Sequence, residues 1–421
     1  MIGSLFHRTE LVWTLWLRIC LLSFLAIALP AFSENEDTSG LTNEKASVAQ
    51  NNDESQMVKL AKLLVNYSVA LQKGEKILLI AENDNAFPLT RTIIEEVYRV
   101  GGQPFVDILD ERVERALYLG TTAKRYEQML AWDSLKYGAM DARILIKGTE
   151  NASEFSDVPE EKKKLKSICW DQVIKDRFMP ERWCALRVPS SGMAQLAGMS
   201  TEAFTDFYYR VCTIDYSRLY EAMEPLERLM AATDKVRIVD SGTDLTFSIK
   251  GIPAVKCAGF GNIPDGELFT APVKYSVDGV LTVNQPSEWL GVTYQDIRME
   301  FKDGRIIRAS ANDSDRFNQV LDTDEGSRYL GEFSFGLNPY IERPINITLF
   351  DEKICMSFHV AIGNSFPYAS NGNKSAVHWD MINIQTPEFG GGEIWFDGRL
   401  IRKDGLFVLP ELGGLNPENL K

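Results

Sequence analysis

Between residues 75 and 110, a short apolar run, an amphipathic segment and a second apolar run follow one another, and few folds accept that order. The first run, "EKILLIAEND", has the length of a buried strand. Apolar residues then recur at helical spacing until Gly101-Gly102 ends the helix, and "PFVDILD" follows as a second strand. Strands joined by a helix in this way run parallel, so the segment predicts a βαβ unit in a parallel sheet.

The same order continues to about residue 233. A long helical stretch from Val113 to Tyr137 precedes "ARILIKG" and "WCALRVPS", two further strands, and residues 201–233 again have helical periodicity. We therefore expect residues 56–233 to form an open α/β domain. Neither a GxGxxG fingerprint nor a Walker loop follows its first strand, so this fold by itself implies no nucleotide.

Beyond Asp234 the pattern changes to short strands separated by turns. The runs "DIRMEFKDGRIIRAS" and "EIWFDGRLIRKDGLFVLP" carry Asp-Gly pairs between alternating segments, which is a strong hairpin signal. The sequence therefore predicts an α/β N-terminal domain with a parallel sheet, followed by a β-rich α+β C-terminal domain over residues 234–421.

The N-terminus has the layout of a secretory signal peptide. Arg18 precedes an apolar run from Ile19 to Leu29, and Ala31-Phe32-Ser33 supplies a small-x-small cleavage site. We expect residues 1–33 to be the signal peptide and the polar residues 34–55 to be a flexible spacer. The protein would then be exported, to a periplasm or out of the cell. The alternative is an uncleaved leader that anchors the protein in a membrane.

Composition narrows the classes of partner. The chain carries 45 Lys and Arg against 59 Asp and Glu, a net charge of −14, and its short basic run "KKKLK" directly follows two glutamates. Nucleic acid is therefore a poor candidate partner, and we expect no membrane partner once the leader is removed. Five cysteines follow residue 33 without a CxxC motif, which argues against a zinc ribbon. Their spacing leaves open one disulfide, Cys169 with Cys184, or five free thiols.

Histidine is scarce, and two of the three histidines stand close together near the C-terminus. If "SAVHWDMI" is a strand, His378 and Asp380 point to the same side, because side chains alternate along a strand. The run "SFHVAIG" reads as another strand, which could bring His359 beside this pair. A histidine and a carboxylate on one face suit a metal ion. The alternative is a hydrogen-bonded histidine in the core.

Three glutamates could complete such a site. Glu267 follows a Pro-Asp-Gly turn in "NIPDGELFTAP", Glu332 follows a glycine in "RYLGEFSFG", and Glu352 lies in "LFDEKI". Each one taken singly fits an ordinary polar loop residue equally well. Together with the two histidines, they form a mixed nitrogen and oxygen donor set of the kind that holds divalent transition metals.

The surrounding motifs resemble one family in order and spacing. They are "GTDLTFSIKG", "NIPDGELFTAPVKYSVDG", "DTDEGSRYLGEFSFGLNPYI", "LFDEKICMSFHVAIGN" and "NGNKSAVHWDMI". They resemble the metalloaminopeptidases typified by aminopeptidase T and aminopeptidase S. The opening run "LAKLLVNYSVALQKGEKILLIAENDNAFPL" resembles the start of that family as well, so the likeness extends over about residues 57 to 410.

The resemblance implies a metallopeptidase with a two-metal site in the C-terminal domain. The positions that match the family's metal ligands are Glu267, Glu332, Glu352, His359, His378 and Asp380. The implied ions are zinc, cobalt or manganese, which together activate a water molecule. We assign Glu332 as general base. The implied substrates are peptides with a free N-terminus, and the implied assembly is a homodimer.

One position departs from the family pattern. The family usually has a tyrosine seven residues after the histidine that matches His359, and this chain has Phe366 there. Phenylalanine cannot donate a hydrogen bond, and loss of one donor to a developing oxyanion costs about 10²–10³ in rate. We predict that Tyr368, two residues further on, takes over this catalytic role. The run between Glu352 and His359 is also longer than in some family members.

Two alternatives keep the fold. Phe366 is consistent with a catalytically impaired homologue that only binds metal or peptide. His359, His378 and Asp380 could instead form the facial triad of a non-haem iron, ring-cleaving dioxygenase. The presence of Glu267 and Glu332 within their motifs favours the two-metal peptidase. A serine hydrolase has less support because no GxSxG motif occurs.

Overall fold

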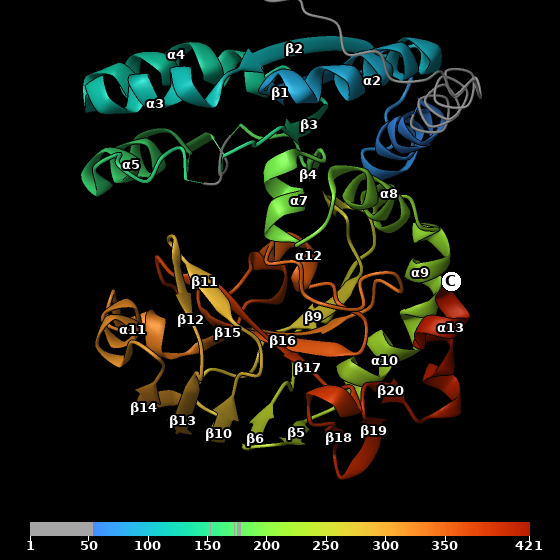
Figure 1. The fold of residues 1–421 in the computed structure, drawn as a ribbon, viewed down its shortest axis with the longest axis vertical. Coiled ribbons are helices and arrows are strands. Elements are labelled where there is room, and N and C mark those ends of the chain that lie inside the picture. The colour runs from blue at the N-terminus through green and yellow to red at the C-terminus, as the bar shows by residue number, and fades with distance from the viewer. Residues whose placement is uncertain (1–53, 152, 172, 175–177) are drawn as a thin grey trace, which may run out of the picture. The chain divides into compact units, whose positions relative to one another are not determined.

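The computed structural model describes residues 54–421, apart from 152, 172 and 175–177 (Figure 1). The predicted signal peptide, and all but the last two residues of the predicted spacer, lie outside these residues. The described chain starts with a helix over residues 54–63 that continues into η1 (Leu64–Ser68). None of its helices has the length and apolar character needed to cross a membrane.

The N-terminal half contains the predicted parallel sheet. Its strands within the described residues are β1 (Lys76–Glu82), β2 (Gln103–Leu109), β3 (Ala142–Lys147), β4 (Arg182–Arg187) and β8 (Gly261–Ile263). The spatial order is β2-β1-β3-β4-β8, and every neighbouring pair is parallel. β8 comes from beyond residue 234 and extends the sheet at the edge opposite β2. The domain boundary between residues 233 and 234 stays a prediction.

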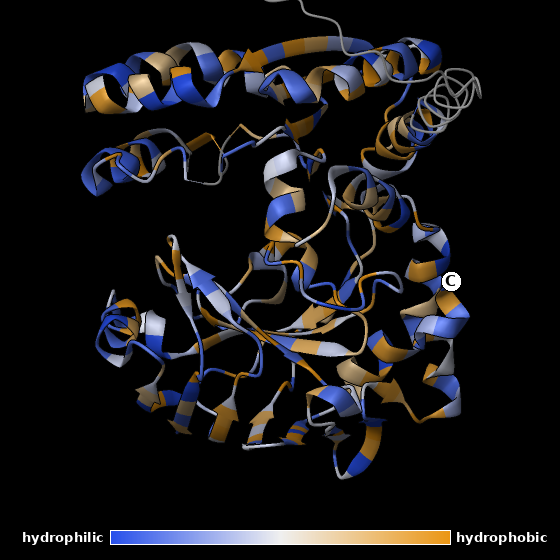
Figure 2. Cartoon of the chain, viewed as in Figure 1, coloured by the Kyte–Doolittle hydropathy of each residue, from blue (hydrophilic) through white to orange (hydrophobic). Residues whose placement is uncertain are grey.

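Helices connect these strands. They are α2 (Phe87–Val100), α3 (Glu111–Gly120), α4 (Ala123–Gly138), α5 (Glu160–Lys166) and α7 (Ser191–Leu196). The helical stretch predicted from Val113 to Tyr137 is helical, and the structure divides it into α3 and α4. Thr122 starts α4 as its N-cap, and its side chain accepts a hydrogen bond from the backbone N–H of Arg125 at 3.3 Å. Both helices carry hydrophilic and hydrophobic residues (Figure 2), which is why periodicity concealed the break.

The helical stretch predicted over residues 201–233 is also divided, into α8 (Thr201–Cys212), α9 (Tyr216–Ala222) and α10 (Glu224–Ala232). Asp215 caps α9 by accepting from the backbone N–H of Arg218 at 3.0 Å.

An antiparallel sheet of eight strands dominates the C-terminal half of the described chain. Its strands are β5 (Lys235–Asp240), β6 (Thr243–Ser248), β10 (Asp278–Thr282), β13 (Arg298–Lys302), β14 (Arg305–Ser310), β18 (Glu393–Phe396), β19 (Arg399–Lys403) and β20 (Leu406–Phe407). They lie in the order β14-β13-β10-β6-β5-β18-β19-β20. Three hairpins turn at Asp303-Gly304, Asp397-Gly398 and Asp404-Gly405, all with positive φ. The Asp-Gly signal therefore predicted these turns correctly.

A second antiparallel sheet lies against the first. Its described strands are β7 (Val255–Cys257), β9 (Glu267–Thr270), β15 (Leu330–Gly336), β16 (Ser357–Gly363) and β17 (His378–Ile384), in the order β17-β16-β15-β9-β7. The rings of Phe333 and Phe335 on β15 meet Phe247 on β6 and Phe396 on β18, at centroid distances of 5.1 and 6.2 Å. One face of the second sheet therefore packs against the first sheet and forms part of the hydrophobic core.

Shorter elements complete the C-terminal half. They are β11 (Ser287–Trp289), β12 (Val292–Tyr294), α11 (Ser314–Leu321), α12 (Thr348–Asp351) and α13 (Pro417–Leu420).

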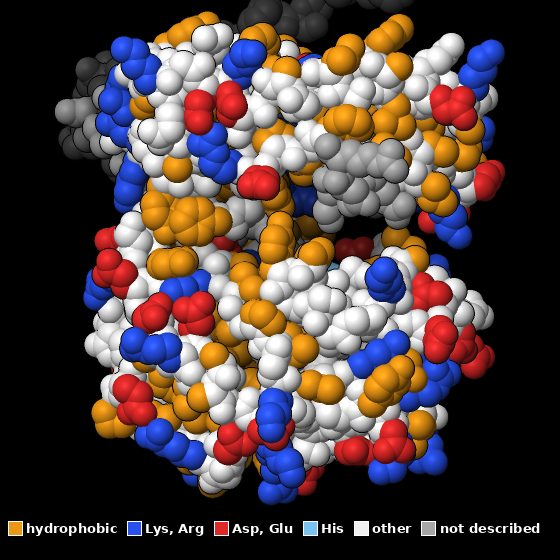
Figure 3. All heavy atoms as spheres, turned by 180° about the vertical axis from the view of Figure 1, so that it is seen from behind, with side chains coloured by type: hydrophobic (Ala, Val, Ile, Leu, Met, Phe, Trp, Pro, Cys, Tyr) orange, Lys and Arg blue, Asp and Glu red, His pale blue; other side chains and the backbone are white. Residues whose placement is uncertain are grey.

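Basic and acidic side chains lie interspersed over the described part of the face shown in Figure 3.

The five cysteines that follow residue 33 are all free thiols. The disulfide between Cys169 and Cys184, one of the two alternatives, is therefore not formed. Burial raises the pKa of Cys184 and Cys212 well above that of an ordinary thiol, so both stay protonated and pack as apolar side chains.

Arg402 connects the two antiparallel sheets. It lies on β19, is only 1% exposed, and donates from Nη1 to the carbonyl oxygen of Ser357, the first residue of β16, at 2.6 Å. Its Nε donates to the carbonyl oxygen of Gly405 at 2.8 Å. The guanidinium also lies 5.5 Å from the centroid of the Phe335 ring. A buried arginine held by carbonyl oxygens and aromatic rings fixes the start of a strand that carries a candidate site residue.

We expect Arg402→Ala to destabilise the fold by about 3 kcal/mol, because it leaves two buried carbonyl oxygens unpaired and creates a cavity. Thermal and urea unfolding of the chain from Glu34 measure this loss. Arg399→Ala is the matched control on the same strand: Arg399 pairs with Glu411 at the surface, and its loss should cost about 0.5 kcal/mol or less. Equal losses for the two variants would contradict this role of Arg402.

Candidate metal centre

Strand alternation places the predicted site residues that lie on β9, β15, β16 and β17 on the face of the second sheet that points away from its phenylalanine core. Asp380 on β17 pairs with Ala361 on β16, which pairs with Glu332 on β15. Directly paired residues point to the same side, so the two carboxylates lie on either side of a small alanine methyl group. His378 shares their face, as the alternation in "SAVHWDMI" predicts.

A bulge at Gly331 brings Glu332 to that face. Leu330 pairs with Ile362, but Glu332 pairs with Ala361, so the register of β15 shifts by one residue between them. Without the extra residue, Leu330 and Glu332 would point to the same side. The bulge lets Leu330 remain in the core while Glu332 points into the site.

Glu332 lies between the two histidines. Its Oε1 is 3.4 Å from His359 Nε2, and its Oε2 is 3.4 Å from His378 Nε2. Glu267 Oε2 approaches His359 Nε2 from the other side at 3.4 Å, and Asp380 Oδ1 is 3.6 Å from His378 Nε2. The ligand atoms thus form two groups that share Glu332, and within each group they lie within 4.8 Å of one another.

The electrostatics of this cluster call for positive charge. Burial lowers the pKa of His359, but Glu332 and Glu267 outweigh it and raise the pKa to about 9. Burial also lowers the pKa of His378, yet Asp380 and Glu332 raise it to about 10. Burial raises the pKa of Glu332, while the two histidines bring it down to about 2. In the absence of a metal ion, protons on the imidazoles compensate the carboxylates.

The donor atoms fit a divalent cation. The carbonyl oxygen of Asn364 lies 2.8 Å from His378 Nδ1, which places the proton of a neutral His378 on Nδ1. The Nε2 lone pair then faces the carboxylates of Glu332 and Asp380, an arrangement that is repulsive unless a proton or a cation lies between them. His359 Nδ1 is buried and has no hydrogen-bond partner among the described residues, so none of them fixes its proton as Asn364 fixes that of His378.

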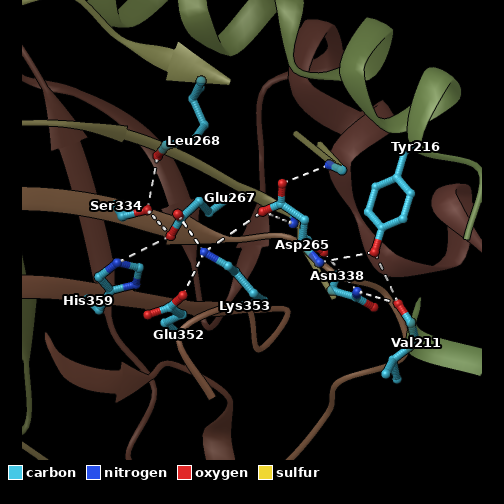
Figure 4. A network of polar contacts seen from close by, with 12 residues as sticks. Val211, Tyr216, Asp265, Glu267, Leu268, Ser334, Asn338, Glu352, Lys353 and His359 are labelled. Carbon is cyan, nitrogen blue, oxygen red and sulfur yellow. Dashed lines mark hydrogen bonds and ion pairs between the residues drawn. The ribbon is translucent and has the colours of Figure 1, made fainter. Parts of the chain in front are cut away.

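Glu352 reaches the cluster through a residue that sequence reasoning missed. The ammonium group of Lys353, 1% exposed, lies 2.8 Å from Glu352 Oε1 and 2.5 Å from Glu267 Oε1 (Figure 4). Asp265 Oδ1 is 3.8 Å from the same nitrogen. Burial lowers the pKa of Lys353, but these carboxylates raise it well above its ordinary value, so it is cationic. The ligand role of Glu352 stays a prediction.

Two signals in the sequence could have revealed these residues. Asp265 precedes Glu267 by two positions, the spacing that also joins His378 to Asp380. Lys353 follows directly after Glu352 and precedes the apolar residues Ile354–Met356. Neither signal is specific, because buried and exposed lysines look alike in a single sequence.

The two aromatic candidates differ in position. The Phe366 ring packs edge-on against the His378 imidazole, with the ring centroids 4.6 Å apart. Tyr368 lies in the short helical turn η5 (Pro367–Ala369), and 72% of its surface is exposed. The structure therefore puts Phe366 beside a candidate ligand. The catalytic role predicted for Tyr368 stays a prediction.

Known proteins that are similar to this chain include two named aminopeptidases and the solved structure of AmpT. Aminopeptidase AmpS of Bacillus subtilis is 27% identical over 370 residues, which cover 76% of this chain and 87% of AmpS. Aminopeptidase 2 of Geobacillus stearothermophilus is 25% identical over 410 residues, 84% of this chain and 95% of its own. The solved structure of wild-type AmpT from Thermus thermophilus covers 84% of this chain and 99% of its own, with a TM-score of 0.73 and 21% identity. That likeness confirms the predicted fold class.

A family model described as thermophilic metalloprotease (M29) matches residues 53–393. The match covers the parallel sheet, the five-stranded antiparallel sheet and every predicted ligand. It confirms the resemblance seen in the sequence motifs, and with it a peptidase that depends on divalent metal. The chain belongs to the thermophilic metalloprotease family M29.

Proposed function

We propose that this protein is an aminopeptidase that removes the N-terminal residue of peptides with the help of two divalent metal ions. The observation that carries the proposal is the pair of ligand groups that share Glu332. The relatives named aminopeptidases align over most of their own length, which supports the substrate class.

The charge of the site supports bound cations. Burial raises the pKa of Asp265 to about 7 and that of Glu352 to about 8, and the Lys353 ammonium group lies beside both carboxyl groups. The carboxylates of Glu267, Glu332 and Asp380 face the imidazoles, and with neutral imidazoles their negative charge would be left uncompensated, which is costly away from water. Divalent cations would compensate it. Imidazole and carboxylate donors suit zinc, cobalt or manganese.

In this proposal each ion binds three side chains, and Glu332 belongs to both sets. Glu267, Glu332 and His359 would hold one ion, and Glu332, His378 and Asp380 the other. When bound, such a pair lowers the pKa of a shared water and polarises the scissile carbonyl. Glu332 was predicted as the general base, but a carboxylate that directs Oε1 to one group and Oε2 to the other would have neither oxygen free to accept a proton, so we propose it here as the ligand shared by both ions. Asn364 keeps the His378 imidazole in the tautomer that presents Nε2 to the site.

A second candidate follows from Phe366. A phenyl ring against His378 offers no hydrogen bond to a developing oxyanion, so a homologue that binds metal and peptide without turnover would have the same geometry. An iron dioxygenase is less well supported. A triad of His359, His378 and Asp380 leaves no role for Glu267 or for the central position of Glu332.

We expect the purified chain, begun at Glu34 and stripped with a chelator, to regain peptide hydrolysis when zinc, cobalt or manganese is restored. The assay measures release of the first amino acid from short peptides. An N-acetylated peptide is the control, because it lacks the free amine. Light scattering on the same sample tests the proposed homodimer. Two bound ions without any release would contradict the aminopeptidase and support the impaired homologue.

We expect Phe366→Tyr to raise kcat at least tenfold, because it restores a hydroxyl donor next to His378. Phe269→Tyr is the matched control: the Phe269 ring is 5.6 Å from that of Phe366 on the same side of the sheet, and the added hydroxyl should leave kcat unchanged. If Phe366→Tyr has no effect and Tyr368→Phe abolishes activity, Tyr368 supplies the donor instead.

We further propose that residues 1–33 direct export and are then removed. N-terminal sequencing of the protein recovered from the periplasm or the medium should begin at Glu34. Recovery of the full-length chain in the membrane fraction would contradict cleavage and show that the leader is an anchor.

A further inference from the structure

A lysine occupies a place in this centre where a metal ion would otherwise be expected. Cys257, Asp265 and Glu267 offer ligand atoms within 4.8 Å of one another, a third group of the kind that holds a cation. The Lys353 ammonium lies within ion-pair distance of both carboxylates in this group (Figure 4). The chain itself therefore supplies the positive charge at this end of the centre.

The backbone fixes Lys353 in that position. Its N–H donates to the carbonyl oxygen of Phe350 at 3.0 Å, and its own carbonyl oxygen accepts from the N–H of Asn338 at 3.0 Å. The preceding turn is tied by Asp351, whose carboxylate accepts from the N–H groups of Ile345 and Ile347 at 2.8 and 3.2 Å. The lysine side chain is aimed from a rigid turn and not from a flexible loop.

The two carboxylate oxygens of Glu267 have different neighbours, and Lys353 contacts only one of them. Oε1 contacts the ammonium group, whereas Oε2 accepts a hydrogen bond from Ser334 Oγ at 3.2 Å and faces His359. Only Oε2 is directed toward the group that contains Glu332. Glu352 Oε1 is likewise engaged by Lys353 at 2.8 Å.

The other half of the centre has no such neighbour. Within the described residues, the ion-pair partners of Glu332 and Asp380 are histidines alone. An ion held by Glu332, His378 and Asp380 would therefore have full use of its carboxylates. An ion held by Glu267, Glu332 and His359 would lie on the side of a fixed positive charge, which repels it.

We propose that Lys353 is a positioning residue that acts as a permanent cation of the centre, pairs with Glu352 in place of a metal ion, and makes the ion at Glu267 and His359 the more weakly held of the two. This inference rests on the two-metal centre proposed above. It gives Glu352 a role different from the ligand role that the sequence resemblance implies.

The test is metal retention by the full chain from Glu34, loaded with Zn²⁺ alone and dialysed against a series of chelator concentrations. Bound zinc is counted by elemental analysis, and a Co²⁺-loaded sample gives an absorption spectrum for each site. We expect the wild-type chain to lose its two ions at chelator concentrations at least tenfold apart. Glu267→Gln should remove the weakly held ion and keep the other.

Lys353→Met should raise the affinity for the weakly held ion at least tenfold, because the repelling charge is gone. Lys256→Met is the matched control: Lys256 is another shielded lysine between two glutamates, Glu224 and Glu227, and its loss should leave both affinities unchanged. Glu352→Gln keeps the test decisive if Lys353→Met does not fold, and it should retain two ions.

Different failures have different meanings. Loss of an ion in Glu352→Gln, as in Glu267→Gln, would make Glu352 a metal ligand and overturn this inference alone. An unchanged or lower affinity for the weak ion in Lys353→Met would overturn it as well. A wild-type chain that retains no divalent ion under any condition would overturn the two-metal function, and this inference with it.

Discussion

The repulsion among buried carboxylates is the constraint around which this centre is organised. Glu267, Glu332 and Asp380 project from three strands of one sheet; the first two are buried and Asp380 is half-buried, so their charge needs compensation. Hydrogen bonds between the strands hold these side chains together despite the repulsion. The phenylalanine core on the opposite face keeps the strands in place. The stability of the sheet thereby keeps together carboxylates that need positive charge beside them, from protonated imidazoles or from bound cations.

Local periodicity explains what the sequence could predict. His378 and Asp380 share a face because a strand repeats every two residues, and this holds whatever lies around the strand. The parallel sheet and the Asp-Gly hairpins depend on equally local patterns. The motifs of the family added Glu267 and Glu332, which no periodicity would have singled out.

The features that were missed depend on contacts between distant segments. The position of Lys353 among three carboxylates depends on where α12 packs, and the pairing of β8 with β4 depends on a strand that follows the α10 helix. The break at Thr122 within the predicted helical stretch is a different case. Its capping signal was local, but apolar residues recur on both sides of it and concealed the break.

A short connection joins the parallel sheet directly to the sheet of the metal centre. β8 belongs to the parallel sheet, β9 belongs to the sheet of the metal centre, and only residues 264–266 separate them. Within that connection the N–H of Asp265 donates to the Tyr216 hydroxyl at 3.0 Å, and the Asn338 amide binds the carbonyl oxygens of Asp265 and Val211 (Figure 4). Helices α8 and α9 therefore help to set the position of Glu267.

The bulge at Gly331 couples backbone spacing to the chemistry of an imidazole. A Cβ atom at this position would lie 2.3 Å from the carbonyl oxygen of Asn364 and 2.5 Å from that of Gly363. The first of these oxygens accepts the proton of His378 Nδ1. Any side chain at residue 331 would push this acceptor away and release the imidazole to exchange its tautomers. The absence of a single methyl group on one strand thus decides which nitrogen of a histidine on another strand is basic.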